Sequence, residues 1–285
     1  MFVALNNWQR GDYKPYLVKS SDRGRTWTAI AGDLPERHDV WAIAQDHVNG
    51  DLLFAGTEFG LFASVDGGRH WVQLKGGLPV TQVRDLAVQR RETDLVIATF
   101  GRGFYVLDDY TPLREISAQA LTEDAHLFAL RDAYLFNPTG QQPAGAAGIG
   151  AMAGNWTAPN PPFGAVFTFS LRQDPPGDAK LVMTITDESG KQIRRFDVDK
   201  GTGLRRVAWN LRADPPPPSR AGGAGEAGRA GEAGRAGGAG GGRGGPPQGP
   251  LVAPGRYHAQ LGRQSGTEVT PLGQEQSFLV VPLDR

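Results

Sequence analysis

Ser20-Ser-Asp-Arg-Gly-Arg-Thr-Trp27 recurs 44 residues later as Ser64-Val-Asp-Gly-Gly-Arg-His-Trp71. The flanking sequence repeats in the same phase, because Gly32–Pro35 is followed at that offset by Gly76–Pro79. A fixed period of this size predicts tandem copies of one supersecondary unit, each of which buries its apolar face against its neighbours.

One complete unit is predicted to hold four short strands, at about 40–45, 52–56, 60–65 and 71–74. These segments are rich in β-branched and aromatic residues and are bounded by Gly, Asn, Asp or Pro. Four strands in about 44 residues is typical of a propeller blade. With the partial units on either side, residues 1–115 are expected to form about two and a half four-stranded blades.

The repeated octapeptide is expected to stabilise the turn between the third and fourth strands of a blade. Its Asp accepts hydrogen bonds from turn amides, its Gly permits a positive φ, and its Trp packs between hairpins. The residues of this predicted structural role are Ser20, Asp22, Gly24, Thr26 and Trp27 in the first copy and Ser64, Asp66, Gly68, His70 and Trp71 in the second.

These octapeptides resemble the Asp boxes (BNR repeats) of sialidases and sortilin-type propellers. Ala98–Arg114 is similar to the end of the last blade in large bacterial sortilin-like BNR proteins, which often carry the label "glycosyl hydrolase". Asn160–Phe169 resembles the entry to their C-terminal domain. The resemblance implies a C-terminal fragment of such a β-propeller protein, located in the periplasm, at the cell surface or outside the cell.

A fragment is also expected from the blade count. Residues 2–5, 16–19 and 27–30 supply only the second to fourth strands of a blade, and a propeller closes with typically four to eight blades. The remaining blades are therefore expected from a missing N-terminal part, or from another chain. On this hypothesis, residues 1–115 alone have poor solubility, and more Asp boxes are encoded upstream.

The region 163–285 is expected to be an Ig-like or fibronectin-like β-sandwich, with Leu204, Val207 and Trp209 in its core. Residues 116–162 are expected to connect it to the blades, with Ala125–Phe136 as a strand or packing arm. The Gly/Ala-rich insert 215–250 has almost no side chains to bury and is predicted to be disordered. A collagen helix is excluded there because its Gly-containing triplets hold no Pro.

Composition excludes several classes of function. Acidic and basic residues balance at 30 each, which gives no indication of a nucleic-acid partner, and no stretch is long and apolar enough to span a membrane. Cysteine is absent, and the five histidines fall at no metal-ligand spacing, so no metal or cofactor is expected. No nucleophile elbow is present, and Gly101–Gly103 is too short for a phosphate-binding loop.

Three residues in or near strand-connecting turns are candidates for a ligand surface: Glu58, Arg102 and Asp108. The main hypothesis is a non-catalytic binding or scaffold protein for a protein, peptide or glycan ligand. The alternative is a glycoside hydrolase whose catalytic residues lie in the missing blades, and a third hypothesis is a structural domain of a surface or secretion system. A hydrolase requires two converging carboxylates, whereas binding requires a face lined with aromatic and Arg side chains.

Overall fold

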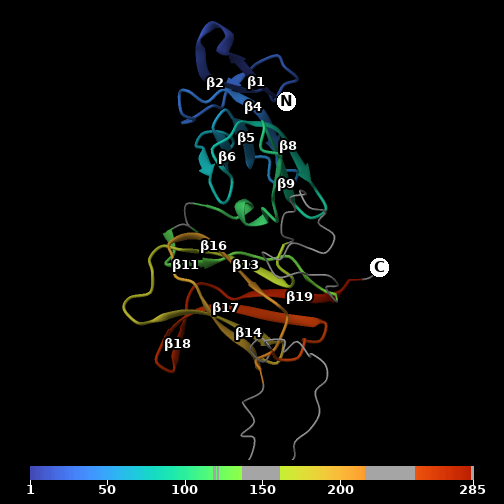
Figure 1. The fold of residues 1–285 in the computed structure, drawn as a ribbon, viewed down its shortest axis with the longest axis vertical. Coiled ribbons are helices and arrows are strands. Elements are labelled where there is room, and N and C mark those ends of the chain that lie inside the picture. Colours follow the sequence, from blue (N-terminus) through green and yellow to red (C-terminus); the bar gives the residue numbers. More distant parts are fainter. Residues whose placement is uncertain (118–119, 121, 137–160, 216–247, 284–285) are drawn as a thin grey trace, which may run out of the picture. The chain divides into compact units, whose positions relative to one another are not determined.

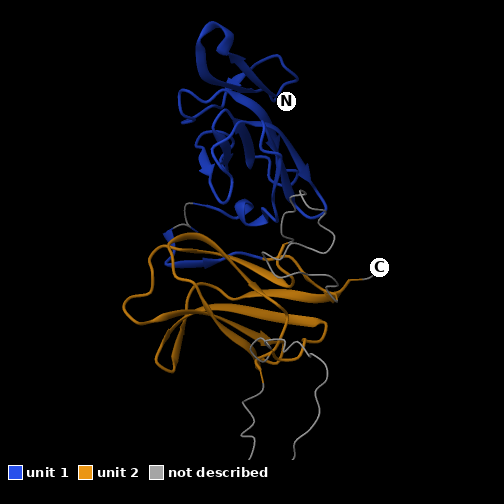
Figure 2. Cartoon of the chain, viewed as in Figure 1, with its two compact units in different colours: residues 1–129 blue, residues 130–285 orange. Residues whose placement is uncertain are grey.

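The computed structural model describes residues 1–117, 120, 122–136, 161–215 and 248–283 of an all-β chain (Figure 1). The chain forms two compact units, residues 1–129 and 130–285 (Figure 2). The expected blade region 1–115 lies within the first unit, and the expected connector 116–162 is divided between the two. Most of the predicted disordered insert, 216–247, lies outside the described residues.

The first unit contains three small antiparallel sheets, in the orders β1-β2-β3, β4-β5-β6-β7 and β10-β9-β8. The strands are β1 (Phe2–Asn7), β2 (Asp12–Lys19), β3 (Thr28–Ala29), β4 (Val40–Gln45), β5 (Leu53–Thr57), β6 (Gly60–Ser64), β7 (Val72–Leu74), β8 (Val83–Gln89), β9 (Asp94–Thr99) and β10 (Phe104–Leu107). The four strands predicted for the complete unit are confirmed to within a residue at most ends. Two short 3-10 helices, η1 (Trp8–Arg10) and η2 (Thr111–Arg114), and the strand β11 (Ala125–Leu127) complete the named elements of this unit.

The middle sheet is packed on both faces. Successive strand residues point to opposite faces of a sheet. Accordingly, Leu53 of β5 belongs to an apolar cluster with Leu17 of β2, whereas Phe54 belongs to a second cluster with Leu95 of β9. β4 lies next to both β1 and β8. The repeat therefore produces sheets stacked side by side, with each neighbour covering one face of the middle sheet.

The two octapeptide turns have the same hydrogen-bond pattern. Asp22 accepts hydrogen bonds from the Thr26 amide at 2.8 Å and the Thr26 hydroxyl at 2.7 Å. Asp66 accepts from the His70 amide at 3.0 Å and lies 2.6 Å from His70 Nδ1. In each turn the Ser hydroxyl donates to the Asp at 2.8 Å. Histidine at the Thr position thus occupies the same place in the turn.

Ionised carboxylates suit these turns. The hydrogen bonds from Thr26 and Ser20 lower the pKa of Asp22 to about 2. For Asp66, burial raises the pKa, but the hydrogen bonds from His70, Ser64 and Arg69 outweigh it and leave the pKa well below its usual range. Both acids are therefore charged at neutral pH and accept the turn donors at full strength.

The strands of the second unit belong to two sheets. In one, β13 pairs with β16, and the other is a mixed sheet in the order β12-β19-β17-β14-β15, with β18 paired to β17. β12 runs parallel to β19, and the other pairs are antiparallel. The strands are β12 (Ala133–Leu135), β13 (Ala165–Leu171), β14 (Lys180–Asp187), β15 (Gln192–Val198), β16 (Gly203–Trp209), β17 (Gly255–Ser265), β18 (Glu268–Pro271) and β19 (Gln276–Pro282).

Aromatic residues join the two sheets of this unit. Phe167 of β13 and Trp209 of β16 contact Phe278 of β19, with ring centroids 5.6 and 6.2 Å apart. Trp209 is buried, as predicted, but the prediction for Leu204 is wrong, because its side chain is 47% exposed. Leu204 lies an odd number of residues from Trp209 on β16, so it points to the other face of the sheet.

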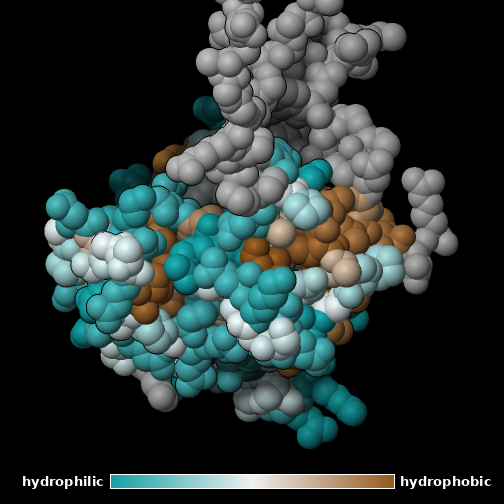
Figure 3. All heavy atoms as spheres, turned by 90° about the horizontal axis from the view of Figure 1, so that it is seen from below, coloured by the Kyte–Doolittle hydropathy of each residue, from teal (hydrophilic) through white to brown (hydrophobic). Residues whose placement is uncertain are grey.

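The surface drawn in Figure 3 is largely hydrophilic, with hydrophobic residues gathered in separate areas.

Candidate ligand-binding cleft

A cleft of about 540 Å³ opens in the first unit and is lined mainly by aromatic and charged side chains. We call it the aromatic cleft; its lining residues are Trp8, Tyr13, Arg37, Asp39, Trp41, Glu58, Phe59, Gln82, Arg84 and Phe100. Large aromatic surfaces together with a few charged groups are the usual composition of a ligand-binding site.

Strand topology brings these residues together from three sheets. In an antiparallel meander the turn after the second strand lies beside the start of the first, and Val40 of β4 accordingly pairs with Thr57 of β5. In the same way, Val83 of β8 pairs with Thr99 of β9, which places Phe100 at this end of its sheet. The two octapeptide turns follow β2 and β6 at their other ends. The aromatic cleft and the octapeptide turns therefore lie at opposite ends of the strands.

Glu58 is held in the cleft by two donors. Trp41 Nε1 donates to Glu58 Oε2 at 2.9 Å, and Gln82 Nε2 donates to the same oxygen. The Glu58 amide also donates to the Asp39 carbonyl at 3.0 Å, which fixes the two acidic residues next to each other. The turn itself is closed by Thr57, whose hydroxyl donates to the Gly60 carbonyl at 2.9 Å.

Asp39 is the most unusual group of the cleft. It is 2% exposed, and its Oδ1 is buried without a hydrogen-bond partner. Burial raises the pKa of Asp39, and the nearby charges of Glu58 and Asp12 raise it further. A buried carboxylate without a donor destabilises the fold when it is charged, so this residue is a candidate for contact with a ligand.

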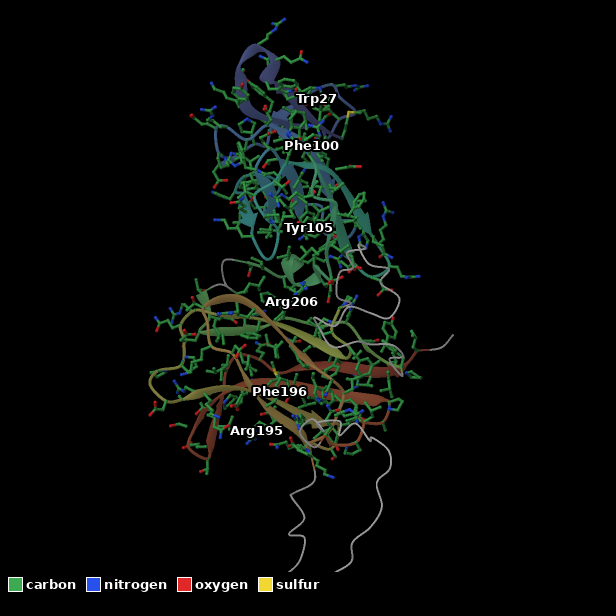
Figure 4. All side chains as sticks on the ribbon, viewed as in Figure 1. Trp27, Phe100, Tyr105, Arg195, Phe196 and Arg206 are labelled. Carbon is green, nitrogen blue, oxygen red and sulfur yellow. The ribbon has the colours of Figure 1, made fainter. Side chains whose placement is uncertain are left out.

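The two cationic side chains of the cleft lie over aromatic rings. The Arg84 guanidinium is 4.0 Å from the ring centroid of Trp41, and the Arg37 guanidinium is 5.5 Å from that of Tyr13. Such cation–π contacts orient a guanidinium, and Arg84 Nη1 also donates to Gln82 Oε1 at 3.4 Å. Phe100, labelled in Figure 4, is 71% exposed and offers an apolar face to a ligand.

His38 supports the cleft from behind. Its ring contacts Phe59 and Phe62 edge-on, with centroids 5.2 and 5.5 Å apart. Burial lowers the pKa of His38, so the ring is neutral at pH 7. It therefore positions Phe59 and adds no charge beside Asp39.

The three residues proposed from sequence are not brought together. Glu58 lines the aromatic cleft, and Arg102 is exposed in the same turn as Phe100 without lining the cleft. Asp108 follows the other end of β10 and is partly buried there. At about 3.3 Å per residue, the length of β10 separates Asp108 from Arg102. A ligand role for these residues remains a prediction.

A larger groove of about 690 Å³ runs along the second octapeptide turn, and its lining includes Lys19, Asp51, Asp66 and His70. Asp66, its central acid, already accepts hydrogen bonds from Ser64, Arg69 and His70. Because the Asp66 carboxylate already accepts the hydrogen bonds of its turn, this groove offers a ligand fewer free polar groups than the aromatic cleft does.

A buried polar cluster at the opposite end of the strands from the cleft was not predicted. Asp46, whose side chain is fully buried, accepts two hydrogen bonds from Arg114 at 2.8 and 2.9 Å and one from the Tyr110 hydroxyl at 2.8 Å. Burial alone would raise the pKa of Asp46, but these hydrogen bonds and the Arg114 charge hold it well below its usual range. Tyr110 and Arg114 lie 64 and 68 positions after Asp46, so no local pattern links them to it. The cluster is saturated internally and has a structural role.

The described part of the chain contains no group of three acidic or histidine side chains arranged to hold a metal ion. Within the same residues, no helix has the length and apolar character needed to cross a bilayer.

No protein-family model matches the sequence, and no curated protein matches it significantly. Among solved structures, the chain is similar to PorZ, an essential bacterial surface component of the type-IX secretion system of Porphyromonas gingivalis. The TM-score is 0.31 and the sequence identity is 14%, and the match covers 98% of this chain and 37% of PorZ. The extracellular domain of BT4673 from B. thetaiotaomicron, described as a putative hybrid two-component system, gives a TM-score of 0.27 and 10% identity, with 94% and 28% coverage. Both neighbours are bacterial surface or extracellular proteins, and this chain spans about a third of their length.

Proposed function

We propose that the first unit is part of an Asp-box β-propeller and acts as a non-catalytic binding or scaffold module, with its ligand in the aromatic cleft. The observation that carries this proposal is the cleft itself, where three stacked sheets contribute exposed rings and two arginines that form no ion pair with the described residues to one surface. The position of the cleft also supports the proposal. The Asp boxes lie at the other end of the strands, where their side chains already form the hydrogen bonds of their own turns.

On the same proposal, the three sheets are successive blades and the second unit is an Ig-like sandwich that serves as a spacer or docking module. The equivalent hydrogen bonds of Asp22 and Asp66 and the two-sided burial of the middle sheet support the blade interpretation. The Asp-box resemblance also supports a location in the periplasm, at the cell surface or outside the cell.

A glycoside hydrolase is the second candidate, and one observation favours it. Asp39, whose pKa is raised by burial and by Glu58, lies beside that second carboxylate in one cleft, as in an acid and nucleophile pair. Against catalysis, Glu58 Oε2 already accepts hydrogen bonds from Trp41 and Gln82, which occupy the lone pairs that a nucleophile or general base would use.

Binding and hydrolysis are separated by one set of measurements on the 285-residue chain. Peptide and oligosaccharide panels are tested for binding by fluorescence anisotropy, and the oligosaccharides are then incubated and analysed for cleavage. We expect binding that Phe100→Ala weakens, without product formation. Cleavage that Glu58→Gln abolishes would establish the hydrolase, and binding unaffected by both Phe100→Ala and Phe59→Ala would exclude the aromatic cleft as the site.

A further inference from the structure

The charge balance of the aromatic cleft points to the chemistry of its ligand, provided that the cleft is the binding site as proposed above. The Asp39 carboxylate has a buried oxygen without a donor, and no side-chain hydrogen bond joins it to another described residue. Native proteins rarely leave a buried polar atom unpartnered, so a missing donor suggests a group supplied from outside the chain.

The groups around Asp39 add negative charge. Glu58 and Asp12 are close enough to act on Asp39 electrostatically, and His38 is neutral. The guanidiniums of Arg37 and Arg84 lie over Tyr13 and Trp41, and in the part of the chain that the structure describes neither forms an ion pair with a carboxylate. Among the described residues, the carboxylates of Asp39 and Glu58 therefore have no ion-pair partner, although Arg37 and Arg84 line the same cleft.

A neutral donor would satisfy only part of this environment. A sugar hydroxyl can donate a hydrogen bond to Asp39, but it leaves the repulsion between Asp39 and Glu58 in place. A cation supplies both the donor and the opposite charge, and hydrogen bonds between charged groups are about twice as strong as neutral ones.

The walls of the cleft suit the rest of such a ligand. Trp8, Phe59 and Phe100 line the cleft and are exposed. Lysine and arginine combine an apolar stem with a charged end, and the stem packs against apolar surface while the end reaches its partner.

We propose that the aromatic cleft binds a basic side chain of a peptide, with its ammonium or guanidinium group between the carboxylates of Asp39 and Glu58. The stem of that side chain packs against Phe59 and Phe100, and the arginines over Trp41 and Tyr13 flank the site and contact acceptors of the peptide backbone.

The test compares labelled, end-capped peptides Gly-Gly-Lys-Gly-Gly and Gly-Gly-Arg-Gly-Gly with the same peptide carrying norleucine at the centre. Fluorescence anisotropy with the 285-residue chain is expected to show at least about tenfold tighter binding of the basic peptides, because norleucine keeps the stem and lacks the charge. If the norleucine peptide bound the unmodified protein as tightly as the basic peptides, the proposal would be overturned.

Variants give the second arm. Asp39→Asn and Glu58→Gln keep the shape of each side chain, and each is expected to lower the affinity for the lysine peptide at least about tenfold. Asp197→Asn, an exposed acid of the second unit, is the matched control and is expected to leave affinity unchanged. Thermal unfolding of each variant verifies folding. Full affinity in Asp39→Asn contradicts a contact with that carboxylate.

An oligosaccharide panel distinguishes this inference from the proposed function. One outcome is that a glycan binds, that Phe100→Ala lowers its affinity and that the basic peptides do not bind. In that case the inference fails, while the aromatic cleft remains a binding site. If neither peptides nor glycans bind, both fail.

Discussion

The indole N–H of Trp71 donates a hydrogen bond of 2.9 Å to the carbonyl of Ile30, which lies 41 residues earlier and just after β3. The Trp71 amide also donates to Asp33 at 2.7 Å. Trp71, the last residue of the second octapeptide, therefore joins its own sheet to the preceding one. The equivalent Trp27, labelled in Figure 4, is 42% exposed, whereas Trp71 is 6% exposed.

This difference predicts unequal effects of one substitution at two equivalent positions. Trp71→Ala removes a buried ring and its indole hydrogen bond to Ile30, but keeps the backbone hydrogen bond to Asp33, and is expected to cost about 3–5 kcal/mol. Trp27→Ala, the matched control, is expected to cost about 1 kcal/mol. Urea unfolding of the 285-residue chain measures both, and equal losses would show that Trp71 does not join the sheets.

The box glycines make a similar pair. Gly24 and Gly68 have φ values of +85° and +95°, but a Cβ at Gly68 would lie 2.7 Å from Ile30 Cβ, whereas the closest atom to one at Gly24 is 3.6 Å away. Gly24→Ala is expected to cost about 1–2 kcal/mol from backbone strain alone. Gly68→Ala adds a steric clash of about 1–3 kcal/mol. Similar unfolding midpoints for the two variants would contradict the close approach of the sheets.

The Asp46 cluster is expected to make stability depend on pH. Its folded-state pKa is depressed, so its contribution is present above the unfolded pKa of about 3.9 and is lost as the pH falls toward the lower folded value. Asp46→Asn leaves the Arg114 charge without its partner and is expected to cost about 3–5 kcal/mol at pH 7. The difference in melting temperature between wild type and variant should become smaller from pH 7 to pH 3 without disappearing; a difference that does not change with pH would exclude the linkage.

Asp39 predicts the opposite behaviour. Its folded-state pKa is raised, so the ionised form destabilises the fold, and stability falls as pH rises from the unfolded pKa through the folded one. Asp39→Asn removes the charge and is expected to stabilise the protein by about 1–3 kcal/mol at pH 7, with a smaller gain at pH 4. Differential scanning calorimetry at both pH values measures this. A lower melting temperature of the variant at pH 7 would show that Asp39 has a stabilising partner.

The strand pattern of the first unit was predictable because it depends on residues that are close together in the sequence. The motif spacing, the glycines of the turns and the β-branched runs locate β4 to β7 closely, and the hydrogen bonds of Asp22 and Asp66 join groups only a few residues apart. In the second unit the burial of Trp209 was predicted correctly from its strand, but that of Leu204 was not, because the face that a strand residue occupies depends on the partner sheet.

The candidate site was only partly predictable. Glu58 was identified from its turn, but Asp39, Trp41 and Arg84 carry no motif. Asp39 stands before an ordinary strand in the sequence, and nothing nearby indicates that its carboxylate is buried beside a second acid. Contacts between sheets create that environment.

The sequence by itself determined the repeat, the four strands of its unit and the turns that close them, because those depend on spacing and on side chains that bond their own backbone. Only the tertiary structure decided that Trp8, Asp39, Glu58 and Phe100 line one cleft and that Trp71 is buried while Trp27 is exposed. Burial and electrostatic environment are properties of neighbours in space, and for these residues the neighbours come from other sheets.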